Sequence, residues 1–333
     1  MFTEALHAIL QDHCTPAHVR AIETSPDRAN ALWQAVAGAG FLELMATEKD
    51  GGAGLGLAEV RPLLELLGAC AMPLPVGQAI ALRALLQPGS RPPEGIITLA
   101  PALRRQADGT LMAPQLPFGL LADQVVGALE GELWLLDAGL AKREPLGLYR
   151  DSLCHLRWEP AAVRHARCLE TDATAQDLEA WGAALHAALL AGALGRSFDL
   201  ALAFCNDRIQ FGRSIGKFQA IQHQLAVMAE HVAATRIAVA SAFASGERRP
   251  MLLAAAFAKA RASEAAGLIA PMAHAVHGAI GVTEEYELQL HTRRLHAWRM
   301  AHGSEAHWHR VVGEALLDSG ERIGDFVRSV QGS

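Results

Sequence analysis

The segment from Arg208 to Met228 holds the side chains best suited to binding a nucleotide. Arg208 carries a planar fork of donors that fits the geometry of a phosphate group. Phe211 and Phe218 offer flat apolar faces, and the glycines between them allow a tight turn. These residues indicate a basic turn between two helices that binds a nucleotide-like cofactor. An ordinary corner between two helices would carry the same pattern, so the residues alone leave both interpretations open.

Two glycine-rich segments do not fit the common phosphate-binding loops. Gly51–Gly56 follows a helical segment rather than a strand, and it cannot be aligned with the G-x-G-x-x-G pattern. Gly212–Lys217 is one residue too short between its glycines for a P-loop, and Phe218 stands where that loop needs serine or threonine. Neither segment therefore predicts a phosphate loop of these types.

The chain has fifteen histidines, which raises the question of a metal centre. His302, His307 and His309 lie near Glu305, but residues two apart point to different faces of a helix. A helical di-iron site needs two facing Glu-x-x-His units, and the chain offers one, at Glu4–His7. The sequence predicts no metal site.

The sequence divides into three zones with different hydrophobic patterns, and the elements in these zones must position the residues named above. Apolar residues recur at helical spacing in the first and third zones, whereas the second has short β-type segments, among them Gln124–Leu129, separated by Pro, Gly and Asp. Thr174 with Asp177 resembles a capping box and predicts a helix start in the third zone. We therefore expect a mainly α protein with a small β-domain. The predicted parts are an N-terminal helical domain (1–88), a shortened middle β-domain (89–170) and a C-terminal four-helix bundle (171–333).

The amino-acid composition and charge of the chain argue against several classes of function. The 333 residues carry a net charge of -6, whereas proteins that bind nucleic acid of any sequence need a basic excess. Five scattered cysteines without a C-x-x-C pair favour a reducing cytoplasm. The N-terminus lacks a secretory signal pattern, and no apolar run reaches the roughly 20 residues of a membrane span. We expect a cytoplasmic protein without a membrane span or a nucleic-acid partner.

Taken whole, Arg208–Met228 closely resembles the R-x-Q-F-G-x-x-I-G-x-F-Q-x-x-Q-H-x-L-A-x-M signature of the acyl-CoA dehydrogenase family. His277–Glu284 looks like that family's H-G-G-x-G-x-T-x-E turn. Gly40–Gly56, with Leu66–Gly68 and Pro73–Pro75, is similar to its N-terminal helical domain. The three motifs occur in the family's order.

This resemblance implies an FAD held between the bundle and the β-domain and touched by a neighbouring subunit. The residues that match the family's flavin contacts are Arg208, Gln210, Phe211, Ile215, Phe218, Gly278, Ala279 and Ser304. Arg208 would neutralise the pyrophosphate across a dimer interface, while Gly278 and Ala279 would allow close approach to the adenine end. The implied assembly is a dimer, paired into a tetramer.

The family reaction is α,β-dehydrogenation of an acyl-CoA thioester. A carboxylate removes the α-proton, a hydride leaves for the flavin, and the electrons pass to an electron-transfer flavoprotein. Acyl-CoA, that acceptor and a second copy or homologous chain are the implied partners.

The chain departs from the family at the catalytic base. Arg293 and Arg294 occupy the place of an Arg-Asp pair, and the usual interval after it leads to His302 instead of glutamate. His302 as base, Glu305 as base, or loss of the standard proton abstraction are the three interpretations. Ala275 also replaces a glutamine near the adenine, and the family's T-E-x-x-x-G-S-D-like flavin segment is not found in 89–170.

These departures resemble the short subunits of heteromeric acyl-CoA dehydrogenases, in which two related chains share flavin sites and one supplies the base. Such complexes act on bulky acyl-CoA esters, including sterol side-chain types. The first hypothesis is an FAD-dependent acyl-CoA dehydrogenase, and the second is a non-catalytic or weakly catalytic subunit that completes a partner's flavin site. A flavin monooxygenase on the same fold is the third.

Overall fold

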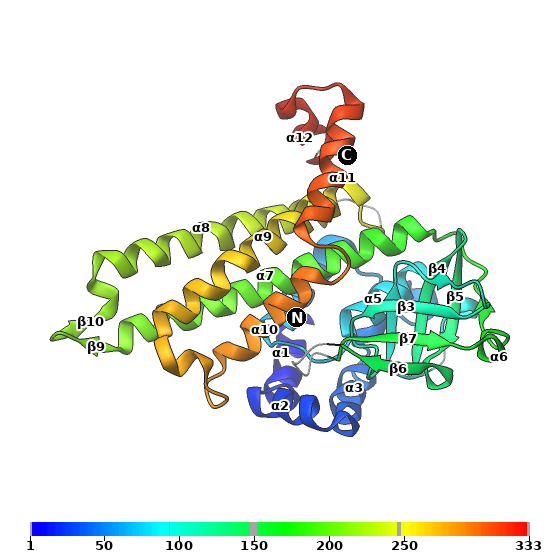
Figure 1. The fold of residues 1–333 in the computed structure, drawn as a ribbon, viewed down its shortest axis with the longest axis horizontal. Helices are drawn as coiled ribbons and strands as arrows, with labels where there is room; N and C mark the ends of the chain where they lie inside the picture. Colours follow the sequence, from blue (N-terminus) through cyan, green and yellow to red (C-terminus); the bar gives the residue numbers. More distant parts are fainter. Residues whose placement is uncertain (1, 93, 147–151, 245–247, 332–333) are drawn as a thin grey trace.

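The computed structural model describes residues 2–92, 94–146, 152–244 and 248–331. Two helical regions flank a region of strands, which confirms the predicted mainly α fold class with a small β part (Figure 1). The helices of the N-terminal region are α1 (Phe2–His13), α2 (Pro16–Thr24), α3 (Ala29–Gly38), α4 (Leu57–Ala69) and α5 (Val76–Leu85).

The strands form two small sheets that enclose a core of their own. The first sheet has the order β1-β4-β5-β8 and pairs β1 (Ile97–Ala100) in parallel with β4 (Gln124–Leu129), followed by antiparallel β5 (Glu132–Asp137) and β8 (Arg167–Cys168). The second is antiparallel, in the order β2 (Arg104–Arg105), β3 (Leu111–Leu116), β7 (Cys154–Trp158) and β6 (Lys142–Pro145). Short helix α6 (Pro160–Val163) connects the two. The buried side chains between them include Leu111, Val125, Leu136 and Leu156.

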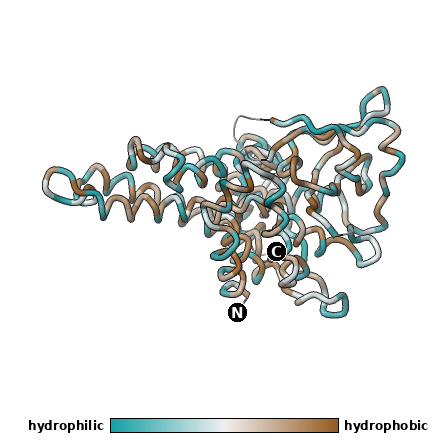
Figure 2. Tube along the Cα trace, turned by 90° about the horizontal axis from the view of Figure 1, so that it is seen from below, coloured by the Kyte–Doolittle hydropathy of each residue, from teal (hydrophilic) through white to brown (hydrophobic). Residues whose placement is uncertain are grey.

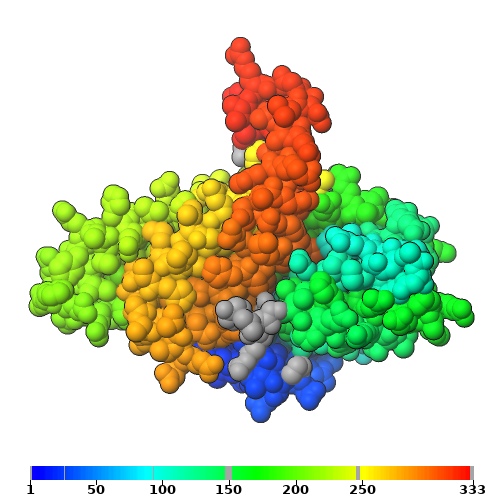
Figure 3. Space-filling view, in the orientation of Figure 1, coloured from blue at the N-terminus to red at the C-terminus, as the bar shows by residue number. Residues whose placement is uncertain are grey.

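The C-terminal region is a bundle built around one long buried helix. Its helices are α7 (Ala175–Asp207), α8 (Gln219–Ala242), α9 (Leu252–His277), α10 (Leu288–Met300), α11 (Glu305–Ser319) and α12 (Ile323–Gln331). Thr174 and Asp177 exchange hydrogen bonds with each other's backbone amides, so the capping box expected from the sequence starts α7. Figures 1 and 3 show α11 and α12 projecting from the body of the molecule.

Two glycines let α4 and α7 cross at close range. A Cβ on Gly192 of α7 would collide with the carbonyl oxygen of Glu65, and one on Gly68 of α4 with that of Leu189. Helix backbones can approach this closely only where side chains are absent. The contact fixes the N-terminal helices on the bundle.

We predict that Gly192→Ala lowers the free energy of unfolding by ~1–3 kcal/mol or more, because the added methyl group meets backbone that cannot move aside. The control is Gly313→Ala on α11, where an added Cβ meets nothing within 4 Å. That change should be neutral or stabilising by up to about 1 kcal/mol, since alanine is the better helix former. Equal losses in the two variants, measured by urea unfolding, would contradict the close crossing.

The expectation that no segment reaches membrane-span length is wrong. Three helical stretches are long and apolar enough to cross a membrane by length and composition alone: Ala175–Asp207, Gln219–Ala242 and Leu252–Val282. In the fold these are the bundle helices, and 67% of the most apolar window of the first is buried inside the molecule. Figure 2 shows apolar residues spread along them, and many are alanines that face neighbouring helices. Helix packing therefore accounts for the apolar character of α7.

Candidate functional site

The predicted nucleotide corner is a tight hairpin between α7 and α8. Strand β9 (Ile209–Gln210) pairs antiparallel with β10 (Arg213–Ser214), and Phe211 and Gly212 between them have positive φ angles of 51° and 76°. Positive φ at both loop positions is typical of a type I′ hairpin turn, and a glycine adopts this left-handed backbone without strain. The turn points its first loop residue outward.

The hairpin presents an aromatic and basic surface to the outside. The side chain of Phe211 is 91% exposed, and Arg208 and Gln210 are exposed as well. The Arg213 guanidinium lies 4.2 Å from the ring centre of Phe218. Ile215, in contrast, is only 9% exposed and packs beneath the hairpin. The structure thus places four of these five predicted contacts at or near the surface and the fifth in the core.

The predicted glycine turn lies at the same end of the bundle as the hairpin. The ring of His277, the last residue of α9, stacks on Phe204 of α7 with centroids 4.6 Å apart. Gly278 follows with φ 65°, and it opens the turn η7 (Gly278–Val282) together with Ala279. We call Arg208–Phe218 with Gly278 and Ala279 the flavin corner. Figure 1 shows the hairpin at the end of the molecule opposite the β-sheets.

The donor set of the flavin corner fits the cofactor that the resemblance implies. No ion pair of the Arg208 guanidinium occurs within the described ranges 2–92, 94–146, 152–244 and 248–331, so its fork of donors is available for a pyrophosphate. The exposed ring of Phe211 can cover an aromatic cofactor face. These groups lie at the end of the bundle opposite the β-domain of the same chain.

His302, the second predicted site, lies in the loop 301–304 between α10 and α11, which we call the base-position loop. His302 has a left-handed backbone with φ 52°, a conformation that is costly for a non-glycine residue. Its ring packs against Gly182 of α7, where any added Cβ would collide with the His302 Nδ1 atom. The missing side chain at Gly182 thus makes the space that the imidazole fills.

A second histidine shares this space. The rings of His302 and His186 lie 4.5 Å apart between centroids, and the His186 Nδ1 atom hydrogen bonds to the Gly182 carbonyl oxygen at 2.8 Å. Both nitrogens of His302 and the Nε2 atom of His186 are enclosed and lack a hydrogen-bond partner among the residues that the structure describes. Burial lowers the pKa of His186 to about 3 and holds the pKa of His302 well below its usual value. Both rings are neutral and are weak proton acceptors.

Glu305, the alternative base, has a different partner. It begins α11 and accepts two hydrogen bonds from the Arg299 guanidinium, one of them from Nε at 2.9 Å. The hydrogen bonds from Arg299 lower the pKa of Glu305 to about 2, so the carboxylate holds protons poorly. Ser304, predicted to touch the cofactor, occupies the N-cap position of α11. The base-position loop and the first residue of α11 thus offer two proton acceptors with strongly lowered pKa values.

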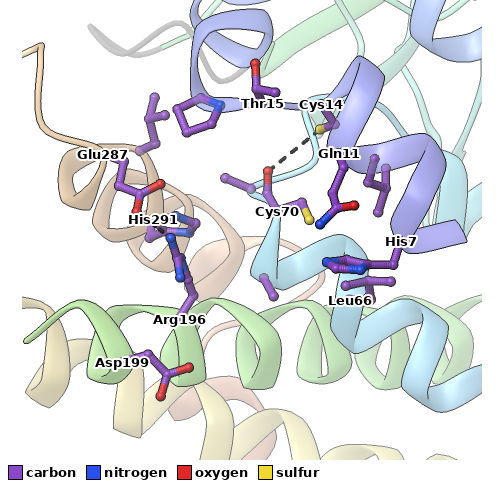
Figure 4. Close-up of a pocket in the computed structure, with 15 residues that line it drawn as sticks. His7, Gln11, Cys14, Thr15, Leu66, Cys70, Arg196, Asp199, Glu287 and His291 are labelled. Carbon is purple, nitrogen blue, oxygen red and sulfur yellow. Dashed lines mark hydrogen bonds and ion pairs between the residues drawn. The ribbon is translucent and has the colours of Figure 1, made fainter. Parts of the chain in front are cut away.

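A separate groove of about 460 Å³ lies between the N-terminal helices and the bundle (Figure 4). Its walls come from α1, α4, α7 and α10, and the Arg196 guanidinium donates to Glu287 at 2.5 Å across its floor. The Cys14 thiol lies 3.7 Å from the Cys70 carbonyl oxygen at its edge. The groove contains none of the residues predicted for catalysis or flavin binding.

Comparison with known proteins agrees with the motifs. Residues 1–91 match the acyl-CoA dehydrogenase N-terminal domain, and residues 174–317 match the C-terminal domain of the same family. The acyl-CoA dehydrogenase IpdE2 of Mycolicibacterium smegmatis is 32% identical over 305 residues, which cover 89% of this chain and 91% of that protein. The chain belongs to the acyl-CoA dehydrogenase family.

Solved structures of this family share the fold. The chain superposes on a subunit of the ChsE4-ChsE5 complex from Mycobacterium tuberculosis with a TM-score of 0.83 at 24% identity, over 95% of this chain and 96% of that one. It superposes on a chain of a Tcur3481-Tcur3483 steroid ACAD variant with a TM-score of 0.81 at 25% identity, over 96% and 97%. The butyryl-CoA dehydrogenase of Megasphaera elsdenii aligns with a TM-score of 0.73 at 18% identity, over 95% and 97%.

One buried charged residue near the base-position loop could not be assigned from the sequence. Lys259 of α9 is fully buried, and its ammonium donates to the carbonyl oxygens of Arg299 and Gly303, both at 2.9 Å. A lone lysine in the apolar stretch Ala254–Ala262 was the available signal, since a lysine is rarely fully buried unless it has partners. It joins α9 to the base-position loop.

Proposed function

We propose that this chain is a subunit of a heteromeric, FAD-dependent acyl-CoA dehydrogenase and completes the flavin site of a homologous chain without supplying the catalytic base. The observation that carries the proposal is the base-position loop, where His302 is enclosed and neutral and Glu305 is paired with Arg299. Losing a positioned general base costs roughly 10² to 10⁴ in rate. Proton abstraction is therefore assigned to the other chain.

The position of the flavin corner supports a role toward a partner. Arg208, Gln210 and Phe211 are exposed at the end of the bundle away from the β-domain of the same chain. A cofactor between the bundle and β-domain of a neighbouring subunit would meet this end if the two chains pack as a dimer. Arg208 would then neutralise pyrophosphate charge, and Phe211 would cover an apolar face of the cofactor.

The names of the relatives suggest the substrate class. One solved relative is a two-component complex and another is called a steroid ACAD, and both share this fold. We infer a bulky, steroid-derived acyl-CoA thioester as the substrate of the assembled enzyme, with an electron-transfer flavoprotein as acceptor. When bound, FAD supplies the hydride acceptor for α,β-dehydrogenation. This chain's contribution is to hold the cofactor's charged linkage and to exclude water from it.

The test compares the chain alone with its complex. The chain is purified by itself and after co-production with a homologous acyl-CoA dehydrogenase chain that carries the usual glutamate. Flavin absorbance is recorded without oxygen before and after addition of a steroid-derived acyl-CoA. We expect flavin only in the complex, because the flavin corner faces away from its own β-domain, and we expect bleaching only there, because the isolated chain lacks an effective base. The control complex has its partner's glutamate replaced by glutamine, and it should keep flavin but lose bleaching.

Two outcomes would contradict the proposal. If the isolated chain binds flavin and bleaches with acyl-CoA, the chain is itself an acyl-CoA dehydrogenase that supplies its own base. If it consumes oxygen with a reduced flavin and without any CoA ester, the flavin monooxygenase hypothesis takes its place.

A further inference from the structure

Lys259 occupies an unusual position for a lysine. Its side chain is fully buried inside the bundle, and the ammonium makes three hydrogen bonds: to Ser263 Oγ at 2.8 Å and to the carbonyl oxygens of Arg299 and Gly303 at 2.9 Å each. An ammonium has three donors and no acceptor, so all of its donors have partners here. The first bond stays within α9, and the other two reach the end of α10 and the base-position loop.

These contacts fix the loop on both sides of His302. The Gly303 carbonyl is held by Lys259, and the His302 carbonyl accepts a hydrogen bond from Trp308 Nε1 at 2.9 Å. Trp308 is fully buried, so the second anchor is rigid as well. The two anchors account for the left-handed backbone of His302, which would relax without them. The ring is thereby kept in the space beside Gly182.

The charges around Lys259 come from four elements. His186 faces it from α7, Arg299 from α10, His302 from the base-position loop and Glu305 from α11. Burial lowers the pKa of Lys259 to about 7, while the Glu305 carboxylate opposes that decrease and Arg299 adds to it. The nearby ammonium also contributes to the lowered pKa values of both histidines. The buried ammonium is compatible with the two histidines because both imidazoles are neutral.

We propose that Lys259 is the positioning residue of the base-position loop, and that its buried ammonium keeps a proton acceptor at position 302 weakly basic, so that an imidazole there stays neutral and a carboxylate there stays ionised. The hydrogen bonds of Lys259 do not depend on whether this chain is catalytic, and the inference rests on the proposed function only in taking position 302 as the place of the usual base. A glutamate placed at 302 would lie beside the ammonium and would be held ionised as its partner. Restoring a base here therefore requires a change at Lys259 as well.

The first test follows the titration of His302 by NMR of the full chain labelled at histidine, with His302→Asn used to assign the signal. In the unchanged chain the ring should titrate well below the ordinary histidine pKa of about 6.5. In Lys259→Met the loop loses its anchor at the Gly303 carbonyl and water reaches the ring, so the His302 pKa should rise toward the ordinary histidine value of about 6.5. The control is Arg261→Met, on the same helix but paired with Glu264 and His231, which should leave His302 unchanged. The same titration in the unchanged chain and in Lys259→Met would overturn the proposal.

A second variant keeps the test decisive if Lys259→Met does not fold. In His302→Glu with Lys259 intact, the new carboxylate should titrate below the ordinary glutamate pKa of about 4.3, because the ammonium favours its charged form. A value above about 4.3 is what burial alone would give, and it would overturn the charge argument. Both measurements use this chain without flavin or partner, so their failure is distinguishable from failure of the proposed function.

Discussion

Replacing Arg208 with alanine should remove most of the bound flavin from the assembled complex. A hydrogen bond to a charged group contributes about 1.5–3 kcal/mol, so we expect FAD to bind roughly 10- to 150-fold more weakly. The effect should be large because Arg208 is exposed at the hairpin base and is the group whose fork of donors fits a pyrophosphate. Flavin absorbance per complex and titration of the flavin-free complex with FAD measure it.

Lys217→Ala is the matched control, because Lys217 is an exposed basic residue of the same corner but carries a point charge without the fork. Its loss should change flavin affinity far less than the loss of Arg208. Arg208→Lys tests the geometry further, and it should recover only part of the affinity. If Arg208→Ala leaves both flavin content and assembly unchanged, the flavin corner does not face the cofactor.

Local patterns were enough to predict much of this fold. The capping box at Thr174 and Asp177 and the strand Gln124–Leu129 were readable because a few neighbouring residues determine each of them. The second sheet was harder to predict from the sequence, since Lys142–Pro145 has no apolar alternation and becomes a strand only by pairing with Cys154–Trp158. Propensity cannot reveal such pairing, because tertiary context decides it.

The candidate site also has one part that the sequence predicts and another that only the structure reveals. Most of the flavin corner, Arg208–Phe218, lies in one continuous segment, so its motif could be recognised from the sequence. Lys259 meets Gly303 across 44 positions of sequence, and Gly182 meets His302 across a still longer interval. Contacts of this kind depend on how helices pack, and the spacing of neighbouring residues in the sequence does not predict them. The chemistry of the base-position loop was therefore visible only in the structure.

The paired arginines of α10 give the second large expected effect. Glu23 of α2 accepts a hydrogen bond from Arg293 Nη2 and another from Arg294 Nη2, each at 2.7 Å. The side chain of Glu23 is 3% exposed and that of Arg294 is 4% exposed. The sequence had marked these arginines as a departure from the family's Arg-Asp pair, and this buried carboxylate gives both of them a structural role. One acid thus anchors the N-terminal helices to the helix that leads into the base-position loop.

We predict that Glu23→Gln lowers the free energy of unfolding by ~3–5 kcal/mol, because the buried Arg294 guanidinium loses its carboxylate partner Glu23. Glu230→Gln on the exposed face of α8 is the control and should cost less than about 0.5 kcal/mol. Adding Arg294→Met to Glu23→Gln should recover part of the loss, because an apolar side chain needs no counter-charge. Losses in the double variant that equal the sum of the two single losses, measured by urea unfolding, would mean that Glu23 and Arg294 are not coupled. In that case α10 is positioned by apolar packing alone, and Glu23 does not fix the approach to His302.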